Sequence, residues 1–248
     1  MAIQLFKPTF HVDECLSEIR ECLEKGWTGL GFKTVEFEEQ WKKYTGHENA
    51  HFLNSATSGL HLAVKILKME YGWNDNDEII TTPLTFVSTN HAILYENLTP
   101  RFADVDDFLC LDPEDVERKI NSKTRAVIFV GYGGSTGRFE KIVEICKKHN
   151  LALILDAAHM SGTLLNGKTP GLLADVAVYS YQAVKNLPTA DSGMICFKEK
   201  KFDEICRKLS WLGINKDTYA RSTDKGTYKW KYDLEYVGYK DHGNSIIA

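Results

Sequence analysis

The chain has 248 residues, 43% of them hydrophobic and 26% charged, with a formal net charge of -4 at pH 7. This length and composition suit one large domain or two small ones with a substantial core, and the interspersed charges give no sign of a nucleic-acid-binding or membrane-surface protein. No signal peptide or membrane-spanning run is recognisable, and the six scattered cysteines match neither a disulfide framework nor a zinc site, so we expect a cytoplasmic protein without a metal.

Two amphipathic helices are predicted near the N-terminus. The first spans residues 13–25, and a glycine-containing turn at 26–31 leads into the second. The residues expected on the buried face of the first helix are Cys15, Ile19, Cys22 and Leu23. The apolar positions of the second helix are Val35, Phe37, Trp41 and Tyr44.

From residue 50 onward, short apolar strands alternate with helices. The predicted strands are 50–53, 78–82, 100–104, 126–130, 151–155, 175–179 and 194–197. The predicted helices include one that opens at 54–59 and continues through Leu67, then 86–95, 112–120, 139–148 and 201–212. Because the strands are apolar on both faces, they predict a three-layer α/β/α domain with a mixed, mostly parallel sheet. We expect residues 213–248 to be irregular, with one short helix.

Three polar features follow the carboxyl ends of predicted strands, where open α/β sheets bind ligands. Ser55-Ala56-Thr57 opens a helix and is either a phosphate cradle or an ordinary cap. Asp156 ends a wholly apolar strand, as a buried carboxylate that needs a cation or as another cap. Lys185 is either a solvated loop lysine or an amine whose pKa is lowered by desolvation, which makes it a nucleophile toward carbonyls.

A glycine-rich stretch at 131–137 invites comparison with dinucleotide-binding loops. Its spacing is G-x-G-x-x-x-G instead of G-x-G-x-x-G, so we interpret it as a strand-to-helix crossover. Taken together, the three polar features instead indicate a site for one cofactor. A phosphate cradle, an aspartate for a protonated ring nitrogen and a lysine for an aldehyde are what pyridoxal 5'-phosphate requires.

These features lie in segments that resemble a known family, the DegT/DnrJ/EryC1/StrS sugar aminotransferases of the aspartate aminotransferase fold type. The matching segments, in chain order, are 26–29, 54–62, 85–89, 155–159, 180–187 and 237–240. The resemblance covers essentially the whole chain. It implies a large cofactor-binding domain over 1–248, in which 1–30 form an N-terminal helix and substrate-side loop. Residues 213–248 would begin the subunit-interface segment, and the small C-terminal domain of the family would be largely missing.

The resemblance also implies roles for the matched residues. The positions that it assigns to the cofactor are Ser55, Ala56, Thr57, Phe86, Asp156, His159, Ser180, Lys185 and Lys240. Lys185 would be the catalytic Schiff-base lysine, Asp156 the partner of the ring nitrogen, and Phe86 the aromatic residue stacked on the ring. His159 would lie beside the ring hydroxyl. Lys240 would reach the phosphate bound by the partner subunit of a homodimer. The positions on the substrate side are Trp27, Thr28 and Gly29.

The sequence departs from the family pattern at two places in the site. The lysine motif usually continues with a Gly-Glu-Gly-Gly turn, whereas this chain has Ala190, Asp191, Ser192 and Gly193. Gly131 stands where many members carry a histidine. These departures concern the geometry of substrate binding more than the cofactor.

The implied activity is transfer of an amino group, with glutamate as the donor, to the keto sugar of a nucleotide-sugar in amino-sugar biosynthesis. A lysine at position 185, where some relatives have a histidine and catalyse dehydration, favours transamination. The alternative is a truncated relative that turns over weakly or not at all and serves as a binding or interaction protein. A cysteine desulfurase of the same fold type fits the lysine and cradle motifs less well.

Overall fold

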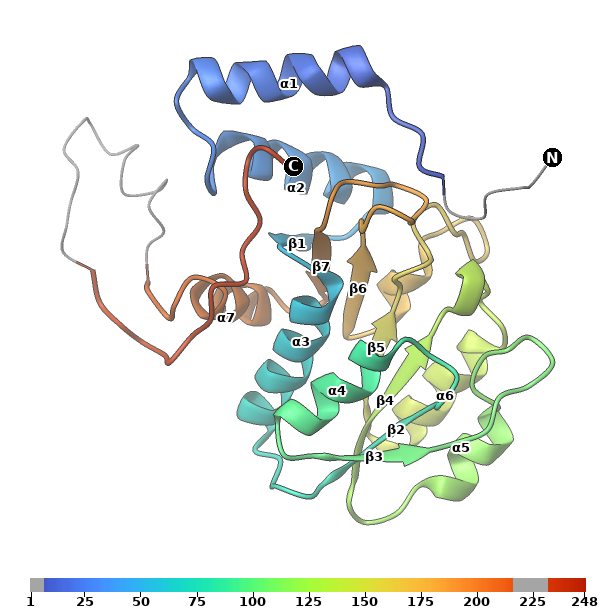
Figure 1. Cartoon of the computed structure of the whole chain (residues 1–248). Coiled ribbons are helices and arrows are strands. Elements are labelled where there is room, and N and C mark those ends of the chain that lie inside the picture. The colour runs from blue at the N-terminus through green and yellow to red at the C-terminus, as the bar shows by residue number, and fades with distance from the viewer. Residues whose placement is uncertain (1–6, 216–231) are drawn as a thin grey trace.

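A seven-stranded sheet forms the centre of the computed structural model, which describes residues 7–215 and 232–248 (Figure 1). The strand order is β1-β7-β6-β5-β4-β2-β3. Strand β7 runs antiparallel to both of its neighbours, and the other neighbouring pairs are parallel, so the predicted mixed, mostly parallel sheet is confirmed. The strands are β1 (Asn49–Leu53), β2 (Glu78–Thr81), β3 (Thr99–Phe102), β4 (Thr124–Val130), β5 (Ala152–Asp156), β6 (Val176–Ser180) and β7 (Gly193–Phe197).

Helices cover both faces of this sheet. One face packs against α3 (Ala56–Tyr71), α4 (Val87–Tyr95) and α7 (Lys200–Leu209), and the other against α2 (Phe32–Thr45), α5 (Pro113–Lys119) and α6 (Phe139–His149). Successive residues of β4 alternate between the two cores, with Val127 and Phe129 in one and Ala126 and Ile128 in the other. Because both faces are covered, the central strands consist mostly of apolar residues, as in the ALILD sequence of β5, which agrees with the three-layer prediction.

Local capping signals set several helix ends. Helix α3 begins after Ser55, whose side chain accepts a hydrogen bond from the backbone of Ser58, and ends at Gly72 with a left-handed φ of 64°. Asn150 ends α6 in the same way, with φ 53°. Two 3-10 turns, Tyr132–Gly134 and Pro170–Leu173, lie in the crossovers after β4 and before β6.

Helix α1 (Val12–Glu24) forms as predicted, but its predicted core face is wrong. Of the four residues expected inside, only Cys22 is buried; Cys15 is exposed, Ile19 is half-buried and Leu23 is 62% exposed. The reason is that α1 does not pack on the sheet and lies over α2 as the outermost helix (Figure 1). Lys33 of α2 holds it there through ion pairs with two glutamates of α1.

The apolar pattern of α2 was also partly misleading. Trp41 is buried, but Val35 and Tyr44 are exposed. A charged residue, Glu38, takes the buried position instead. Its carboxylate accepts hydrogen bonds from the ring of His51 at 2.9 Å and from a backbone N–H of β1 at 2.8 Å. Hydrophobicity alone could not assign a glutamate to the core.

The C-terminal segment returns to the edge of β1 at the point where the site begins. The backbone of Asn54 donates to the carbonyl of Asp241 at 2.8 Å, and Gly243 donates to Phe52 at 3.1 Å. Residues 213–215 and 232–248 contain no helix, so the short helix expected in this region is absent from the described part, and residues 216–231 lie outside it. Among the described helices, none is both long and apolar enough to cross a membrane.

Candidate active site

Several of the predicted site residues lie at the carboxyl edge of the sheet. In register, Gly193 at the start of β7 pairs with Leu53 on one side and Ser180 on the other. Asp156 ends β5, the next strand beyond β6. Because β1, β5 and β6 end at the same edge, the loops that follow them carry their polar side chains to one side of the domain.

The start of α3 has the open geometry of an anion-binding helix N-terminus. The hydroxyl of Ser55 accepts from the backbone N–H of Ser58 at 3.1 Å, while the N–H groups of Ala56 and Thr57 have no acceptor among the described residues. Free N–H groups at a helix N-terminus, together with the helix dipole, favour a phosphate. Ser180, which is buried, lies one strand away from this turn.

Gly193 explains how β7 and the cradle approach so closely. A Cβ atom added at Gly193 would lie 2.6 Å from the nitrogen of Ala56 and 2.7 Å from the carbonyl carbon of Ser55. Backbone atoms cannot move aside cheaply, so only glycine fits between the two segments. Of the glycines in the family's turn, this is the one that the packing of the cradle requires, and this chain keeps it.

Asp156 is a buried carboxylate without a counter-ion. It is 5% exposed, and it accepts hydrogen bonds from the hydroxyl of Thr89 at 2.6 Å and from the N–H of Ala158 at 3.2 Å. Burial raises its pKa, against the lowering effects of these two donors and of the nearby Lys185. No ion pair with Asp156 occurs in residues 7–215 and 232–248. A protonated ring nitrogen would supply the missing cation.

Lys185 lies in the loop between β6 and β7, where its amine is half-buried. The backbone of Lys185 closes a turn by donating to Gln182 at 2.8 Å, and its amine has no hydrogen bond or ion pair with any described residue. Burial lowers the pKa of Lys185, and the carboxylate of Asp156 raises it in part. A partly desolvated amine that has a lowered pKa and no bound partner is suited to nucleophilic attack on a carbonyl.

Two further predicted residues flank this amine and carboxylate. Phe86 caps α4, is 75% exposed, and lies three residues before Thr89, which bonds Asp156. An aromatic ring that is free on the surface beside the site can stack on a planar ligand. His159 accepts a hydrogen bond at Nδ1 from the backbone of Gly133 at 3.1 Å, and burial lowers its pKa, so the ring is held neutral with Nε2–H as a donor.

The structure does not bring the other predicted residues to Lys185 within this chain. The ring of Trp27 packs on Gly31, and Gly29 accepts from the backbone of Ser245, so this turn lies against the C-terminal segment. The amine of Lys240 lies 3.4 Å from the ring centroid of Trp211. Thr28 is exposed. Roles for Trp27, Thr28, Gly29 and Lys240 therefore remain predictions about a larger assembly.

Neighbouring side chains accommodate both departures from the family pattern. Ser192, which replaces a glycine, is buried, and its hydroxyl bonds that of Thr189 at 2.7 Å. A Cβ atom at Gly131 would lie 2.1 Å from the sulfur of Met160. Met160 thus fills the space that a histidine at position 131 would need.

Sequence reasoning missed two parts of the site. Thr89 lay in a matched segment, but nothing in its type or spacing indicated that it would bond Asp156. Residues 7–9 were also missed: together with Val184, Lys185, Asn186 and Pro188 they line a cavity of about 230 Å³. Both contacts join segments that are distant in sequence, so no local pattern could reveal them.

The cradle, the unpaired carboxylate and the unpaired amine fit pyridoxal phosphate, and comparisons with known proteins point the same way. The chain is 35% identical over 228 residues to the spore coat polysaccharide biosynthesis protein SpsC of Bacillus subtilis, covering 92% of this chain and 57% of SpsC. The aminotransferase TlmJ from Streptoalloteichus hindustanus superposes with a TM-score of 0.88 at 30% identity, covering 99% of this chain and 63% of TlmJ. Helicobacter pylori PseC, an aminotransferase involved in the biosynthesis of pseudoaminic acid, gives 0.89 at 26% identity, with 99% and 63% covered.

The chain spans about three fifths of the length of the curated relatives it matches. A model of the DegT/DnrJ/EryC1/StrS aminotransferase family matches residues 11–241. Because that match takes in nearly all of the 248 residues, the chain belongs to the DegT/DnrJ/EryC1/StrS aminotransferase family.

Proposed function

We propose that the chain binds pyridoxal phosphate at this site and catalyses transfer of an amino group to a keto sugar. The observation that carries the proposal is the pair formed by Lys185 and Asp156. An unpartnered amine with a lowered pKa lies near enough to interact electrostatically with a buried carboxylate that lacks a cation, and an open helix N-terminus lies at the same edge of the sheet. Each of these three groups lacks a binding partner, and a single ligand would supply a partner to all three.

Each residue of the site would have a distinct role in binding the cofactor or in proton transfer. Pyridoxal phosphate, when bound, supplies an electron-accepting ring and an aldehyde. Lys185 would hold the cofactor through its aldehyde and, once the amine of the substrate has displaced it, would move a proton to and from the substrate carbon. Asp156, held by Thr89, keeps the ring nitrogen protonated. The N–H groups of Ala56 and Thr57 and the hydroxyl of Ser180 bind the phosphate.

The family and the relatives support a proposal for the substrate class. The name of SpsC places that protein in polysaccharide biosynthesis, and PseC acts in pseudoaminic acid biosynthesis. We propose a keto sugar carried on a nucleotide as the acceptor and glutamate as the donor. A homodimer would bring Lys240 of one subunit to the phosphate of the other. A reducing cytoplasm would keep the six cysteines, all free in the structure, as thiols.

A single-turnover reaction tests the proposal. The chain loaded with pyridoxal phosphate is mixed with one amino acid at a time, without an acceptor, and the 2-oxo acid is measured. Glutamate is expected to give about one equivalent of 2-oxoglutarate per chain, and Lys185→Ala none. A panel of nucleotide-linked keto sugars then identifies the acceptor. A chain that takes up pyridoxal phosphate but releases no 2-oxo acid from any donor would contradict the proposed reaction.

The alternative is a protein that binds a partner or ligand without turnover. Relatives such as TlmJ and PseC are longer, and this chain covers 63% of each. Absorbance separates the two ideas, since cofactor bound to a lysine absorbs visible light and the free protein does not. A chain that stays colourless after addition of pyridoxal phosphate would favour the binding protein.

A further inference from the structure

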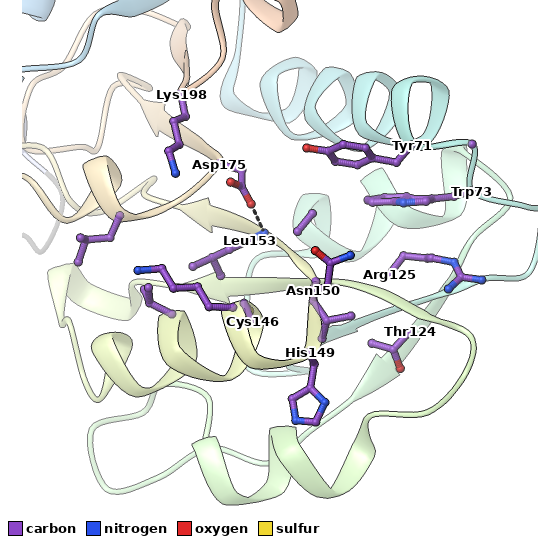
Figure 2. Close-up of a pocket in the computed structure, with 16 residues that line it drawn as sticks. Tyr71, Trp73, Thr124, Arg125, Cys146, His149, Asn150, Leu153, Asp175 and Lys198 are labelled. Carbon is purple, nitrogen blue, oxygen red and sulfur yellow. Dashed lines mark hydrogen bonds between the residues drawn. The ribbon is translucent and has the colours of Figure 1, made fainter.

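A hollow of about 830 Å³ lies at the amino-terminal edge of the sheet, opposite the candidate active site. It is bordered by the C-terminal ends of α3 and α6 and by the ends of β4, β5 and β7 that lie away from Lys185 (Figure 2). The five-residue strands separate the two edges by roughly 15 Å. The hollow is therefore a different place from the site of the proposed reaction, and its size falls within the usual range for ligand sites of about 300–1,000 Å³.

One wall of the hollow is aromatic. Tyr71 and Trp73 lie side by side, with ring centroids 6.2 Å apart and planes at 34° (Figure 2). Tyr71 is exposed, while Trp73 lies beneath it and is mostly buried. Neither the phenol hydroxyl of Tyr71 nor the indole N–H of Trp73 has a hydrogen-bond partner among the described residues. A rigid ring presented at the surface is a platform on which a planar ligand can stack.

The rest of the lining carries polar groups that are only partly used. One carboxylate oxygen of Asp175 accepts from the backbone of Leu153 at 2.8 Å, which fixes its orientation and leaves the other oxygen free (Figure 2). Asn150 presents its side-chain amide to the hollow, and Lys147 and Lys198 present amines. Within the described residues, neither amine forms an ion pair.

Ordinary helix capping does not account for all of these groups. Lys147 lies in the last turn of α6, where the helix dipole alone favours a cation, and Asn150 is the left-handed residue that ends this helix. Lys198 and Asp175 belong to no helix: one follows β7 and the other precedes β6. Their backbones continue the pairing of β5, β6 and β7, since Asp175 donates to Leu153 at 3.0 Å and Lys198 donates to Asp175 at 3.0 Å. This pairing uses neither the amine of Lys198 nor the second carboxylate oxygen of Asp175.

We propose that this hollow binds a nucleoside phosphate at a second site, separate from the proposed reaction. The three parts of such a ligand match three parts of the lining. The base would stack on Tyr71, the ribose hydroxyls would donate to the free oxygen of Asp175, and the phosphates would lie between Lys147 and Lys198. A carboxylate for ribose hydroxyls and amines for phosphate are the usual partners of these groups in proteins.

The test measures binding of uridine diphosphate to the full chain loaded with pyridoxal phosphate. Quenching of tryptophan fluorescence is followed in the wild type and in Trp73→Phe, so that the signal from the hollow is the part that this variant loses. The double variant Lys147→Ala/Lys198→Ala is expected to weaken that binding about tenfold or more, because each lost contact is a hydrogen bond to a charged group. Lys148→Ala is the matched control, since Lys148 follows Lys147 on the same helix, pairs with Glu117 and does not line the hollow. It should leave the affinity unchanged.

Asp175→Asn tests the ribose contact. The wild type should bind uridine diphosphate more tightly than its 2',3'-dideoxy analogue, and Asp175→Asn should bind the two about equally. Pyrophosphate that binds as tightly as uridine diphosphate would show an anion site only and overturn the proposal. So would nucleotide binding that is equal in the wild type and the double lysine variant. Since the readout is binding, a failure of the proposed transamination would not affect the result.

Discussion

Thr89 is expected to control how tightly the cofactor binds, although it would not touch the cofactor itself. Its hydroxyl donates to Asp156 at 2.6 Å, and both side chains are buried. Thr89→Val keeps the shape and removes this donor. A hydrogen bond to a buried charged group contributes about 1.5–3 kcal/mol, which corresponds to roughly a 10- to 100-fold change in an equilibrium constant. We expect the affinity for pyridoxal phosphate to fall by at least about tenfold.

The pH dependence identifies the cause of that loss. Binding needs ionised Asp156, so affinity falls as the pH drops through the pKa of this carboxyl. Thr89→Val removes a donor that lowers the pKa, and the fall should therefore occur at higher pH than in the wild type. The assay is a spectrophotometric titration with pyridoxal phosphate at a series of pH values. Thr89→Ser, which restores the hydroxyl, should behave like the wild type. A serine variant as weak as the valine variant would refute the hydrogen-bond argument and indicate packing instead.

Three further changes probe the site and the core. Because burial raises the pKa of Asp156, ionisation of this carboxyl lowers the stability of the folded chain above about pH 4. Asp156→Asn should therefore raise the melting temperature of the cofactor-free chain at pH 7.5, and this gain should disappear in acid. When pyridoxal phosphate is present, the melting temperature of Asp156→Asn should be lower than that of the wild type. Gly193→Ala places a methyl group 2.6 Å from the nitrogen of Ala56. This variant should bind the cofactor more weakly, and urea titrations should show a loss of about 1–3 kcal/mol of unfolding free energy. An alanine variant with wild-type values would mean that the cradle can shift. Glu38→Gln breaks the ion pair, at 2.9 Å, between the buried carboxylate of Glu38 and the partly exposed Arg207, and should cost about 1.5–3 kcal/mol at pH 7. Burial raises the pKa of Glu38, but the hydrogen bonds and charges of its partners lower it by more, so the net shift is downward. The stabilisation is therefore present at neutral pH and is lost as the pH falls through the folded-state pKa. A cost of the substitution that is equal at pH 7 and pH 4 would contradict the charge-based account.

Much of the fold follows from hydrophobic patterning. The strands that are apolar on both faces, such as β4 and β5, could be predicted with bounds that differ from the structure by one or two residues. The order of the strands and the antiparallel direction of β7 could not, because pairing depends on contacts between distant segments. Helix α1 shows the same limit. Its spacing predicts an amphipathic helix, but no local pattern shows that α2 lies between α1 and the sheet.

The candidate site was predictable to a similar degree. Residues that follow strand ends, such as Asp156 and Lys185, could be assigned because the carboxyl ends of parallel strands meet at one edge. The contact of Thr89 with Asp156 and the close approach that requires Gly193 could not. Each of these depends on the relative position of separate loops to within a few tenths of an ångström, and residue spacing in the sequence carries no information on that scale.

The central claim is that Lys185 is the residue to which the cofactor attaches. Borohydride treatment of the chain loaded with pyridoxal phosphate, followed by mass spectrometry of its peptides, tests this most directly. The account predicts one modified peptide, which contains Lys185, and no modification in Lys185→Ala. Lys7 is the informative competitor, because it lines the same small cavity. A label on Lys7 or on any other lysine in place of Lys185, or no label at all, would contradict the account.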